Sequence, residues 1–285
     1  MNVVGKLLGG CAVFSAGLLV AACAPETPSG AADDGQAESS ALSATSSSYV
    51  TLQHDLRKCA APMCGGWFAT AVDKPNAQPV YVAGLDFAAS GLDDKSQGDV
   101  TSATDGEVVV YGKLGPVGAH NTRNLIVVNA YRGMPGFAPS STDAFYAVNG
   151  AHVAKLNTSV KTPVTSVNTS IGHFIQSDWL QEGVVDDGAL VAGSIDNHVL
   201  TASQVFLKLP VLVGPCPAMP VKQCPSGEVQ TFTRSSDLCL VAQGCVTPGV
   251  CPLFVPYCGT EYTAVSWARS PNGCSMVTCD PAWIH

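Results

Sequence analysis

The sequence is poor in charged residues and lacks the linear signatures of most enzyme classes. Asp, Glu, Lys and Arg make up 13% of the 285 residues, and only 14 residues are Lys or Arg. Binding to nucleic acid depends on basic side chains that neutralise phosphates, and no basic cluster occurs, so a nucleic-acid partner is not expected. A Gly-x-Ser-x-Gly elbow, a Walker loop, a dinucleotide glycine pattern and a His-Glu-x-x-His motif are all missing.

Residues that bind metals are present but scattered. The acidic pairs Asp93-Asp94 and Asp186-Asp187 stand beside Lys or Gly in expected loops and fit no EF-hand, so solvated turns are the simpler interpretation. We expect no metal, no cofactor and no catalytic residue, although a triad assembled only by folding remains an alternative. The histidines show no metal-ligand spacing: His54, His120, His152, His173, His198 and His285.

A hydrophobic run long enough to cross a bilayer, about 20 residues, is also missing. The uncharged run Leu7–Ala22 has 16 residues and follows Lys6, the one charge before it. A positive start, an apolar centre and a small-residue exit are typical of an export signal. Residues 1–22 are therefore predicted to be a signal peptide, and their removal changes the formal net charge from −8 to −9.

The motif Val20-Ala21-Ala22-Cys23 resembles the bacterial lipobox, in which small residues precede a lipidated cysteine. The resemblance implies a diacylglycerol on Cys23 and usually a third acyl chain, such as palmitate. Because two or more chains hold a protein stably on a membrane, we expect a lipoprotein anchored to the bacterial envelope. Ala24 favours the outer membrane over the inner one. Ordinary cleavage at Ala22-Cys23-Ala24 is the alternative, and Cys11 is assigned to the signal.

Residues 23–48 have the composition of a flexible tether. Residues 24–48 contain seven Ser, six Ala, four acidic residues and no Lys or Arg, and Leu42 is their only large apolar residue. Such a segment cannot bury enough surface to offset its chain entropy, so it is predicted to hold a folded body away from the lipid.

Residues 49–212 are predicted to form a mainly β domain. Short β-branched and aromatic runs alternate with Gly, Pro, Asn and Asp, and about 160 residues suffice for one core. This spacing favours a β sandwich or a barrel-like domain, with one helix candidate at Ile175–Glu182. The predicted strands are Tyr49–Gln53, Trp67–Val72, Val80–Phe87, Glu107–Lys113, Asn124–Tyr131, Ala144–Val148, His152–Leu156, Leu190–Ser194 and Gln204–Leu209.

Residues 213–285 form a Cys-rich region with an internal repeat. Units 216–245 and 251–279 each open with Cys-Pro and contain four cysteines. Successive cysteines are separated by 7, 14 and 5 residues in the first unit and by 6, 15 and 4 in the second. This pattern indicates a duplicated module of roughly 35 residues, so two small disulfide-rich repeats are expected to follow the β domain.

The ten cysteines after Cys23 are predicted to form disulfides. An even number in an exported chain is typical of a disulfide framework, and small units need such cross-links. Zinc is the less favoured alternative because no Cys-x-x-Cys occurs and no histidine lies within the repeats. Three pairings remain possible in each repeat. The crossed pairing is favoured: Cys216–Cys239, Cys224–Cys245, Cys251–Cys274 and Cys258–Cys279.

The remaining two cysteines, Cys59 and Cys64, are predicted to bridge a short turn. Pro62 and the Gly65-Gly66 pair favour a turn between them and the strand that follows. A redox pair is the alternative, but the spacing is longer than Cys-x-x-Cys.

The stretch RKCAAPMCGGWFATAV, followed by VYVAGLDF, resembles the opening of an uncharacterised domain of exported myxobacterial lipoproteins. The resemblance covers most of residues 49–285 in patches, among them Lys155-Leu156-Asn157 and the repeats DLCLVAQGCV and SWARSPNGCSMVTCDPAWI. Extra cysteines found in relatives near residues 76–80 and 149–153 are absent. The resemblance implies location and architecture but no activity. The matching residues are Arg57, Lys58, Cys59, Cys64, Gly65, Gly66, Trp67, Tyr81, Val82, Ala83, Asp86 and Phe87.

These observations favour a membrane-anchored envelope lipoprotein with a non-enzymatic binding or structural role and an unknown protein partner. A protease inhibitor is an alternative, because the C-terminal repeats resemble small antistasin-like modules in which crossed disulfides hold a rigid loop. An enzyme whose site is invisible in the linear sequence is the third hypothesis.

Overall fold

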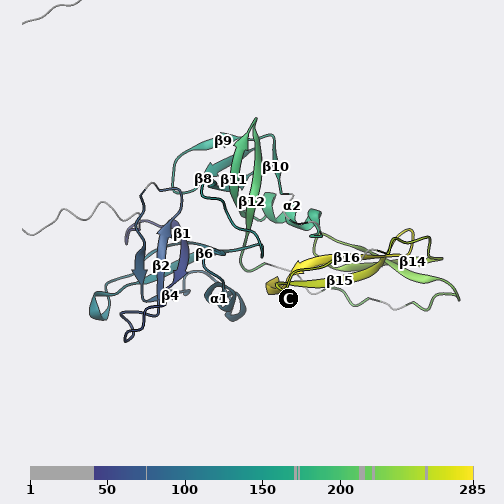
Figure 1. The fold of residues 1–285 in the computed structure, drawn as a ribbon, viewed down its shortest axis with the longest axis horizontal. Coiled ribbons are helices and arrows are strands. Elements are labelled where there is room, and N and C mark those ends of the chain that lie inside the picture. The colour runs from purple at the N-terminus through teal and green to yellow at the C-terminus, as the bar shows by residue number, and fades with distance from the viewer. Residues whose placement is uncertain are drawn as a thin grey trace, which may run out of the picture. The chain divides into compact units, whose positions relative to one another are not determined.

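The computed structural model describes residues 42–284, apart from 75, 170, 171, 173, 212–215, 220, 221, 254 and 255. The predicted signal peptide, Cys23 and most of the predicted tether lie outside these residues. The described chain is mainly β, with a large first sheet followed by a small disulfide-rich sheet, so the expected fold class is confirmed (Figure 1).

The first sheet contains twelve strands. Its order is β3-β2-β1-β5-β6-β12-β11-β7-β8-β9, with β4 paired to β6 and β10 paired to β12. Those two side pairings are parallel, and the neighbours along the main path are antiparallel. The strands are β1 (Ser48–His54), β2 (Trp67–Ala71), β3 (Val80–Val82), β4 (Gly84–Asp86), β5 (Val108–Leu114), β6 (Asn124–Gly133), β7 (Ala144–Asn149), β8 (His152–Lys155), β9 (Lys161–Pro163), β10 (Ser166–Asn168), β11 (Leu190–Asp196) and β12 (Val199–Lys208).

The central strand β5 shows why the sheet forms here. Val108, Val109 and Val110 are all buried, but Val108 and Val110 join one apolar cluster and Val109 joins another. Side chains along a strand alternate between the two faces of the sheet, so this valine run buries residues on both faces. The β-branched valines suit this doubly covered position.

Two strand predictions differ from the structure at their turns. The run Val80–Phe87 is split into two strands, β3, which pairs with β2, and β4, which pairs with β6. The split lies at Ala83, whose amide donates to the carbonyl of Arg123 (2.8 Å). Strand β12 begins at Val199, five residues before the predicted start. Asn197 and His198 both have positive φ, which is the two-residue hairpin turn that best matches strand twist.

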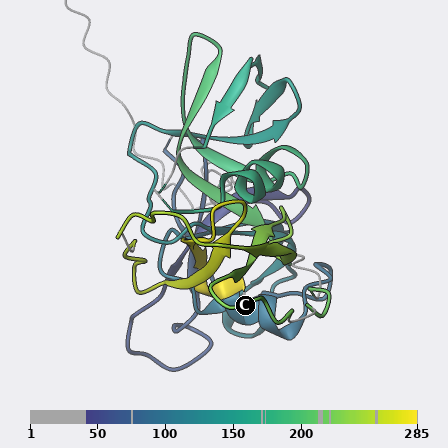
Figure 2. The same cartoon turned by 90° about the vertical axis from the view of Figure 1, so that its right-hand side faces the viewer.

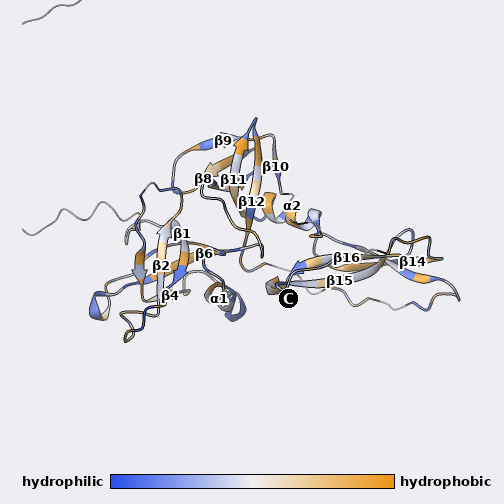
Figure 3. Cartoon of the chain, viewed as in Figure 1, coloured by the Kyte–Doolittle hydropathy of each residue, from blue (hydrophilic) through white to orange (hydrophobic). Residues whose placement is uncertain are grey.

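The sequence pattern does not predict the helix α1 (Asp94–Thr101). The helix α2 (Ser177–Val185) begins two residues after its predicted start and ends three residues after its predicted end. Asp93 is exposed, as expected, but it caps α1, and its carboxylate accepts from the amide of Ser96 (2.8 Å). Figure 3 shows α1 mostly hydrophilic and α2 with hydrophobic residues on it. The amphipathic signal was therefore visible only in α2, which buries Trp179 and Leu180.

The folded body begins earlier than the predicted tether boundary at residue 48. Leu42 is buried in the larger apolar cluster, and the carbonyl of Ser43 accepts from the amide of Leu114 (3.0 Å). One apolar side chain in a polar segment is enough to bind that segment to a core that already exists.

The second sheet, green to yellow in Figure 2, faces the viewer there. Its order is β14-β13-β15-β16, and each sequence repeat contributes one antiparallel hairpin to it. The two hairpins meet through a short parallel contact at Phe232 and Arg269. Its strands are β13 (Val229–Arg234), β14 (Leu240–Val246), β15 (Tyr262–Arg269) and β16 (Cys274–Pro281).

The four disulfides of this sheet have the crossed pairing that the repeat pattern favours. Cys216–Cys239 and Cys251–Cys274 each span 23 residues, whereas Cys224–Cys245 and Cys258–Cys279 each span 21. Each loop between cysteines differs by one residue between the two repeats, but these differences cancel, so corresponding cross-links span equal numbers of residues. The other two pairings within a repeat would give spans that differ between the repeats, so this equality is a sequence signal for the crossed arrangement.

A buried ion pair joins the two hairpins. Arg234 of β13 forms a bidentate contact with Asp280 of β16, and their side chains are only 3% and 2% exposed. The guanidinium also donates to the hydroxyl of Thr278 and the carbonyl of Leu238 and lies 5.6 Å from the ring centre of Trp267. This pair ties the first repeat to the last strand of the second.

Contacts also cross the predicted boundary between residues 212 and 213. The hydroxyl of Tyr262 donates to the carbonyl of Pro135 (2.7 Å), and the amide of Cys279 donates to the carbonyl of Phe174 (2.8 Å). Trp283 and Ile284, in the short turn η3 (Ala282–Ile284), belong to the same apolar cluster as the first sheet. The small sheet is therefore stabilised by burial as well as by cross-links.

We predict that Asp280→Ala lowers the free energy of unfolding by about 3–5 kcal/mol, because it leaves the Arg234 guanidinium buried and unpaired. Urea unfolding with the disulfides intact measures this. The control Arg269→Ala, at an exposed arginine of the same sheet, should cost no more than about 0.5 kcal/mol. The double variant Arg234→Met/Asp280→Leu should recover most of the loss, and equal losses in Asp280→Ala and the control would contradict the prediction.

The cross-links should contribute unequally, because a longer closed loop restricts the unfolded chain more. Cys251→Ala/Cys274→Ala opens a span of 23 residues and should cost about 3 kcal/mol, whereas Cys59→Ala/Cys64→Ala opens a span of 5 and should cost about 2 kcal/mol. Unfolding midpoints of the two double variants test the order. Non-reducing peptide mapping of the unaltered chain tests the pairing itself.

Candidate functional site

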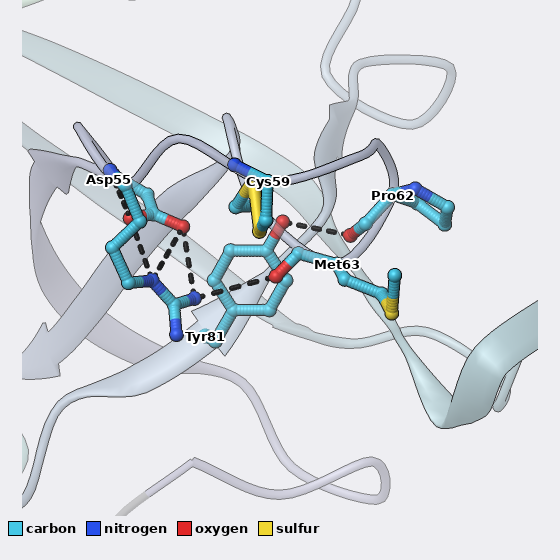
Figure 4. The surroundings of a disulfide bond; sticks show 7 residues. Asp55, Cys59, Pro62, Met63 and Tyr81 are labelled. Atoms are coloured by element: carbon cyan, nitrogen blue, oxygen red, sulfur yellow. Dashed lines mark hydrogen bonds and ion pairs between the residues drawn. A yellow bond between two sulfur atoms is a disulfide. The ribbon is translucent and has the colours of Figure 1, made fainter.

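The connection between β1 and β2, residues 55–66, is called the Cys59–Cys64 loop here. A buried carboxylate holds its first half: the side chain of Asp55 has no exposed surface. Arg57 contacts it through two parallel bonds, Nε to Oδ1 and Nη2 to Oδ2, both 2.9 Å (Figure 4). The amide of Asp55 also donates to the carbonyl of Gly66 (2.9 Å), which closes the loop at its base.

The electrostatics of this pair keep both groups charged. Hydrogen bonds from Arg57 lower the pKa of the Asp55 carboxyl, and the Asp55 carboxylate raises the pKa of Arg57. The guanidinium lies 5.2 Å from the ring centre of Phe68 and 5.3 Å from that of Tyr81, so cation–π contacts add to the ion pair. Arg57 is thus a structural brace and has no free donor fork to offer an anion.

A disulfide and a tyrosine hold the second half of the loop. Cys59 and Cys64 are bonded, with Cα atoms 5.7 Å apart. The hydroxyl of Tyr81 on β3 donates to the carbonyl of Pro62 (2.8 Å), and Figure 4 shows the Tyr81 ring beneath the loop. These contacts favour the structural interpretation of the cysteine pair over the redox one.

The two glycines that follow are required by geometry. Gly65 has a φ of +80°, which side-chain-bearing residues rarely adopt. A Cβ on Gly66 would lie 2.1 Å from the carbonyl oxygen of Val82 on β3. The Cys-Gly-Gly-aromatic motif is therefore a tight turn followed by a close strand contact.

The braced loop presents apolar groups to solvent. Leu56 is 84% exposed and Met63 is 49% exposed, and Lys58 is also exposed. The ion pair, the disulfide and Tyr81 hold the backbone that carries these side chains.

Beside this loop runs a groove over the parallel pair β4 and β6, called the Asp86–Asn124 groove. It consists of two clefts of about 380 and 630 Å³ that share Asp86 and Asn124. The first cleft is bounded by Pro62 of the Cys59–Cys64 loop and by residues 115–119. The second is lined by Leu85, Phe87, Ala88, Gly91, Leu92 and Gln97.

A second braced loop, called the Cys251–Cys258 loop, belongs to the disulfide-rich sheet, and its residues 254 and 255 lie outside the described structure. Both cysteines are bonded to β16, at Cys274 and Cys279. Val250 and Leu253 are fully exposed, and Tyr257 is 85% exposed. This loop combines two covalent anchors with apolar side chains in solvent.

Two of the described histidines lie beside the same residue: His152 pairs with Pro163 across β8 and β9, and Nδ1 of His198 lies 3.3 Å from the carbonyl oxygen of Pro163. His54 is held by Asp105 (Nδ1 to Oδ1, 2.9 Å) and by the carbonyl of Thr101 (3.2 Å), and the hydrogen bond to Asp105 raises its pKa. Within residues 42–284 as described, no group of three or more His, Cys, Asp or Glu is arranged to hold a metal ion. His173 and His285 lie outside the described residues.

Asp186 and Asp187 lie at the end of α2. Both backbone amides donate to the carbonyl of Glu182, at 2.8 and 3.4 Å. They complete the last turn of the helix, so their position is explained by the backbone.

The Lys155-Leu156-Asn157 element has a structural role, because Asn157 connects Tyr49 of β1 with Val72, the residue after β2. The amide side chain of Asn157 accepts from the amide of Tyr49 (2.8 Å) and donates to the carbonyls of Tyr49 and Val72. Lys155 lies 3.9 Å from the buried Asp73, whose pKa is raised by burial. Asn tolerates the positive φ found at residue 157, a signal that could have indicated this role.

All ten predicted cysteines are disulfide-bonded in the structure, whereas the proposed lipid site, Cys23, lies outside the described residues. Over the described part of the chain, helices long and apolar enough to span a bilayer are not found. Sequence reasoning missed Asp55, Arg234 and Asp280 as bracing groups. Asp55 stands two residues before Arg57, but nothing in the linear sequence connects Arg234 with Asp280.

Comparison with known proteins places a domain but no activity. Residues 48–176 match the family described as a domain of unknown function, DUF6748. An uncharacterized protein of Dictyostelium discoideum is 29% identical over 187 residues, a match that covers 58% of this chain and 64% of that protein, less than two thirds of its length. No solved structure matches. Residues 48–176 of this chain therefore carry a domain of unknown function, which includes the Cys59–Cys64 loop and the Asp86–Asn124 groove.

Proposed function

We propose that this chain is a lipid-anchored, non-enzymatic protein of the bacterial envelope that binds a protein partner through its cross-linked loops. The five disulfides indicate an oxidising or extracellular location. The Val20-Ala21-Ala22-Cys23 motif and the resemblance to exported lipoproteins support the anchor.

The observation that carries the binding role is the exposure of the Cys251–Cys258 loop. Exposed apolar side chains grouped on one segment mark interaction sites, and Val250, Leu253 and Tyr257 are grouped in this way. The stretch from Leu238 to Thr260 contains no charged residue, so burying it against a partner desolvates no charge. The two anchoring disulfides reduce the entropy lost on binding.

The same loop supports protease inhibition as a second candidate function. Inhibitory loops are rigid segments whose exposed side chain enters a protease pocket. Leu253 is fully exposed between cysteines that are both bonded to β16. A hydrophobic specificity pocket is the chemistry that would accept this side chain.

The anchor predicts a specific effect of Cys23→Ser when the full chain is expressed in a Gram-negative bacterium. The unaltered chain should incorporate labelled palmitate and sediment with membranes, and Cys23→Ser should lose the label and become soluble. Cys11→Ser is the matched control and should retain both properties. Unchanged membrane association of Cys23→Ser would contradict the anchor.

The inhibitor candidate predicts slower peptide hydrolysis by a serine or cysteine protease at micromolar concentrations of the soluble Cys23→Ser chain. Leu253→Asp should weaken inhibition at least about tenfold, equivalent to about 1.4 kcal/mol. Val241→Asp, at an exposed valine of the other repeat, should leave it unchanged. A lack of inhibition across a panel of both protease classes would remove this candidate and leave the anchor untouched.

A further inference from the structure

The Asp86–Asn124 groove displays polar atoms that the fold does not use. The Oδ1 atom of Asp86 accepts from the amide of Ala88 (3.0 Å), which leaves Oδ2 available. The side-chain Nε2 atom of Gln97 donates to the carbonyl of Leu92 (2.8 Å), which leaves the Oε1 atom of Gln97 available. The side chain of Asn124 has no hydrogen-bond partner among the described residues and is exposed. Three planar polar groups thus border one groove.

The backbone holds two of these groups on strands and the third, Gln97, on the helix α1. Asp86 lies on β4 and Asn124 on β6, and the parallel pairing of Gly84 with Asn124 sets their relative positions. A Cβ on Gly84 would lie only 3.3 Å from Oδ1 of Asn124, so glycine gives this amide its space. Sites built on strands are more precise than sites built on loops, and little reorganisation is needed when a ligand binds.

The composition of the walls limits the ligand. None of the described residues that line the two clefts is Lys or Arg, and the neighbouring Arg123 donates from Nη1 to the carbonyl of Gly115 (3.2 Å), so the walls themselves offer no counter-charge to phosphate, sulfate or carboxylate groups. The single acid is insufficient for a metal, and no metal-binding group of three is found in the described chain. The ligand should therefore be neutral and rich in hydrogen-bond donors.

Apolar surface lies next to these acceptors. Phe87 and the buried Leu92 line the second cleft, and Pro62, Val117 and Ile126 line the first. A sugar ring has this mixed character, because hydroxyls around its edge bond to carboxylate and amide oxygens while its C–H faces pack on apolar side chains. Clefts of this size lie within the range typical of small-molecule sites.

We propose that the Asp86–Asn124 groove binds a neutral saccharide of one to three rings. This site is separate from the Cys251–Cys258 loop and does not depend on the proposed protein partner. Plain glucans and N-acetylated amino sugars share the required chemistry, so the test includes both.

The test is isothermal titration of the soluble Cys23→Ser chain with cellotriose, with triacetylchitotriose and, as a cationic donor, with spermidine. At least one trisaccharide should bind with a dissociation constant at or below about 5 mM. Asp86→Asn keeps the acceptor for Ala88 and should weaken binding about tenfold, because it replaces the free carboxylate oxygen with a donor. Asn124→Ala should weaken binding by a similar factor.

The matched control is Asp178→Asn, at an exposed acid in the first turn of α2, which should bind the sugar normally. Circular dichroism confirms that each variant is folded before titration. Three outcomes would overturn the proposal. They are binding of spermidine alone, no binding of either trisaccharide at 10 times the dissociation constant given above, and equal affinity in the groove variants and the control.

Discussion

Covalent bracing of short loops is the constraint on which the accessible surface of this protein depends. Four large apolar side chains that lie in solvent are Leu56, Met63, Val250 and Leu253. Each lies on or next to a loop whose cysteines are bonded, within β1–β2 or onto β16. The disulfides thus do two things: they offset the small apolar core of the repeats, and they hold the backbone beneath these exposed side chains.

Two buried or half-buried arginine–aspartate pairs extend this bracing through side chains. Asp55 and Arg57 link the start of the first loop to the rings of Phe68 and Tyr81. Arg234 and Asp280 link strands from the two repeats, which also meet in a short parallel contact. Bidentate geometry fixes direction as well as distance, so each pair sets the position of a whole segment.

The structure extends the folded unit beyond the residues that match the domain of unknown function. The match ends at residue 176, just before α2. Strands β11 and β12 come later in the chain, yet they lie between β6 and β7 in the sheet. Without them the paired strands β1–β6 and β7–β9 would lose their connection. Residues 177–208 therefore complete the sheet, because β12 pairs with β6 and β11 pairs with β7 of the matched part.

The sequence by itself determined the β character, most strand positions, the repeat and the disulfide set, because alternation, turn residues and cysteine spacing are local signals. Tertiary structure decided the rest. The burial of Leu42, the ion pair of Arg234 with Asp280 and the pairing of Gly84 with Asn124 join residues far apart in the chain. The helix α1 was missed because tertiary contacts and the Asp93 cap, rather than an apolar stripe, define it. Pairing between distant segments depends on which strands become neighbours, and no local pattern encodes that.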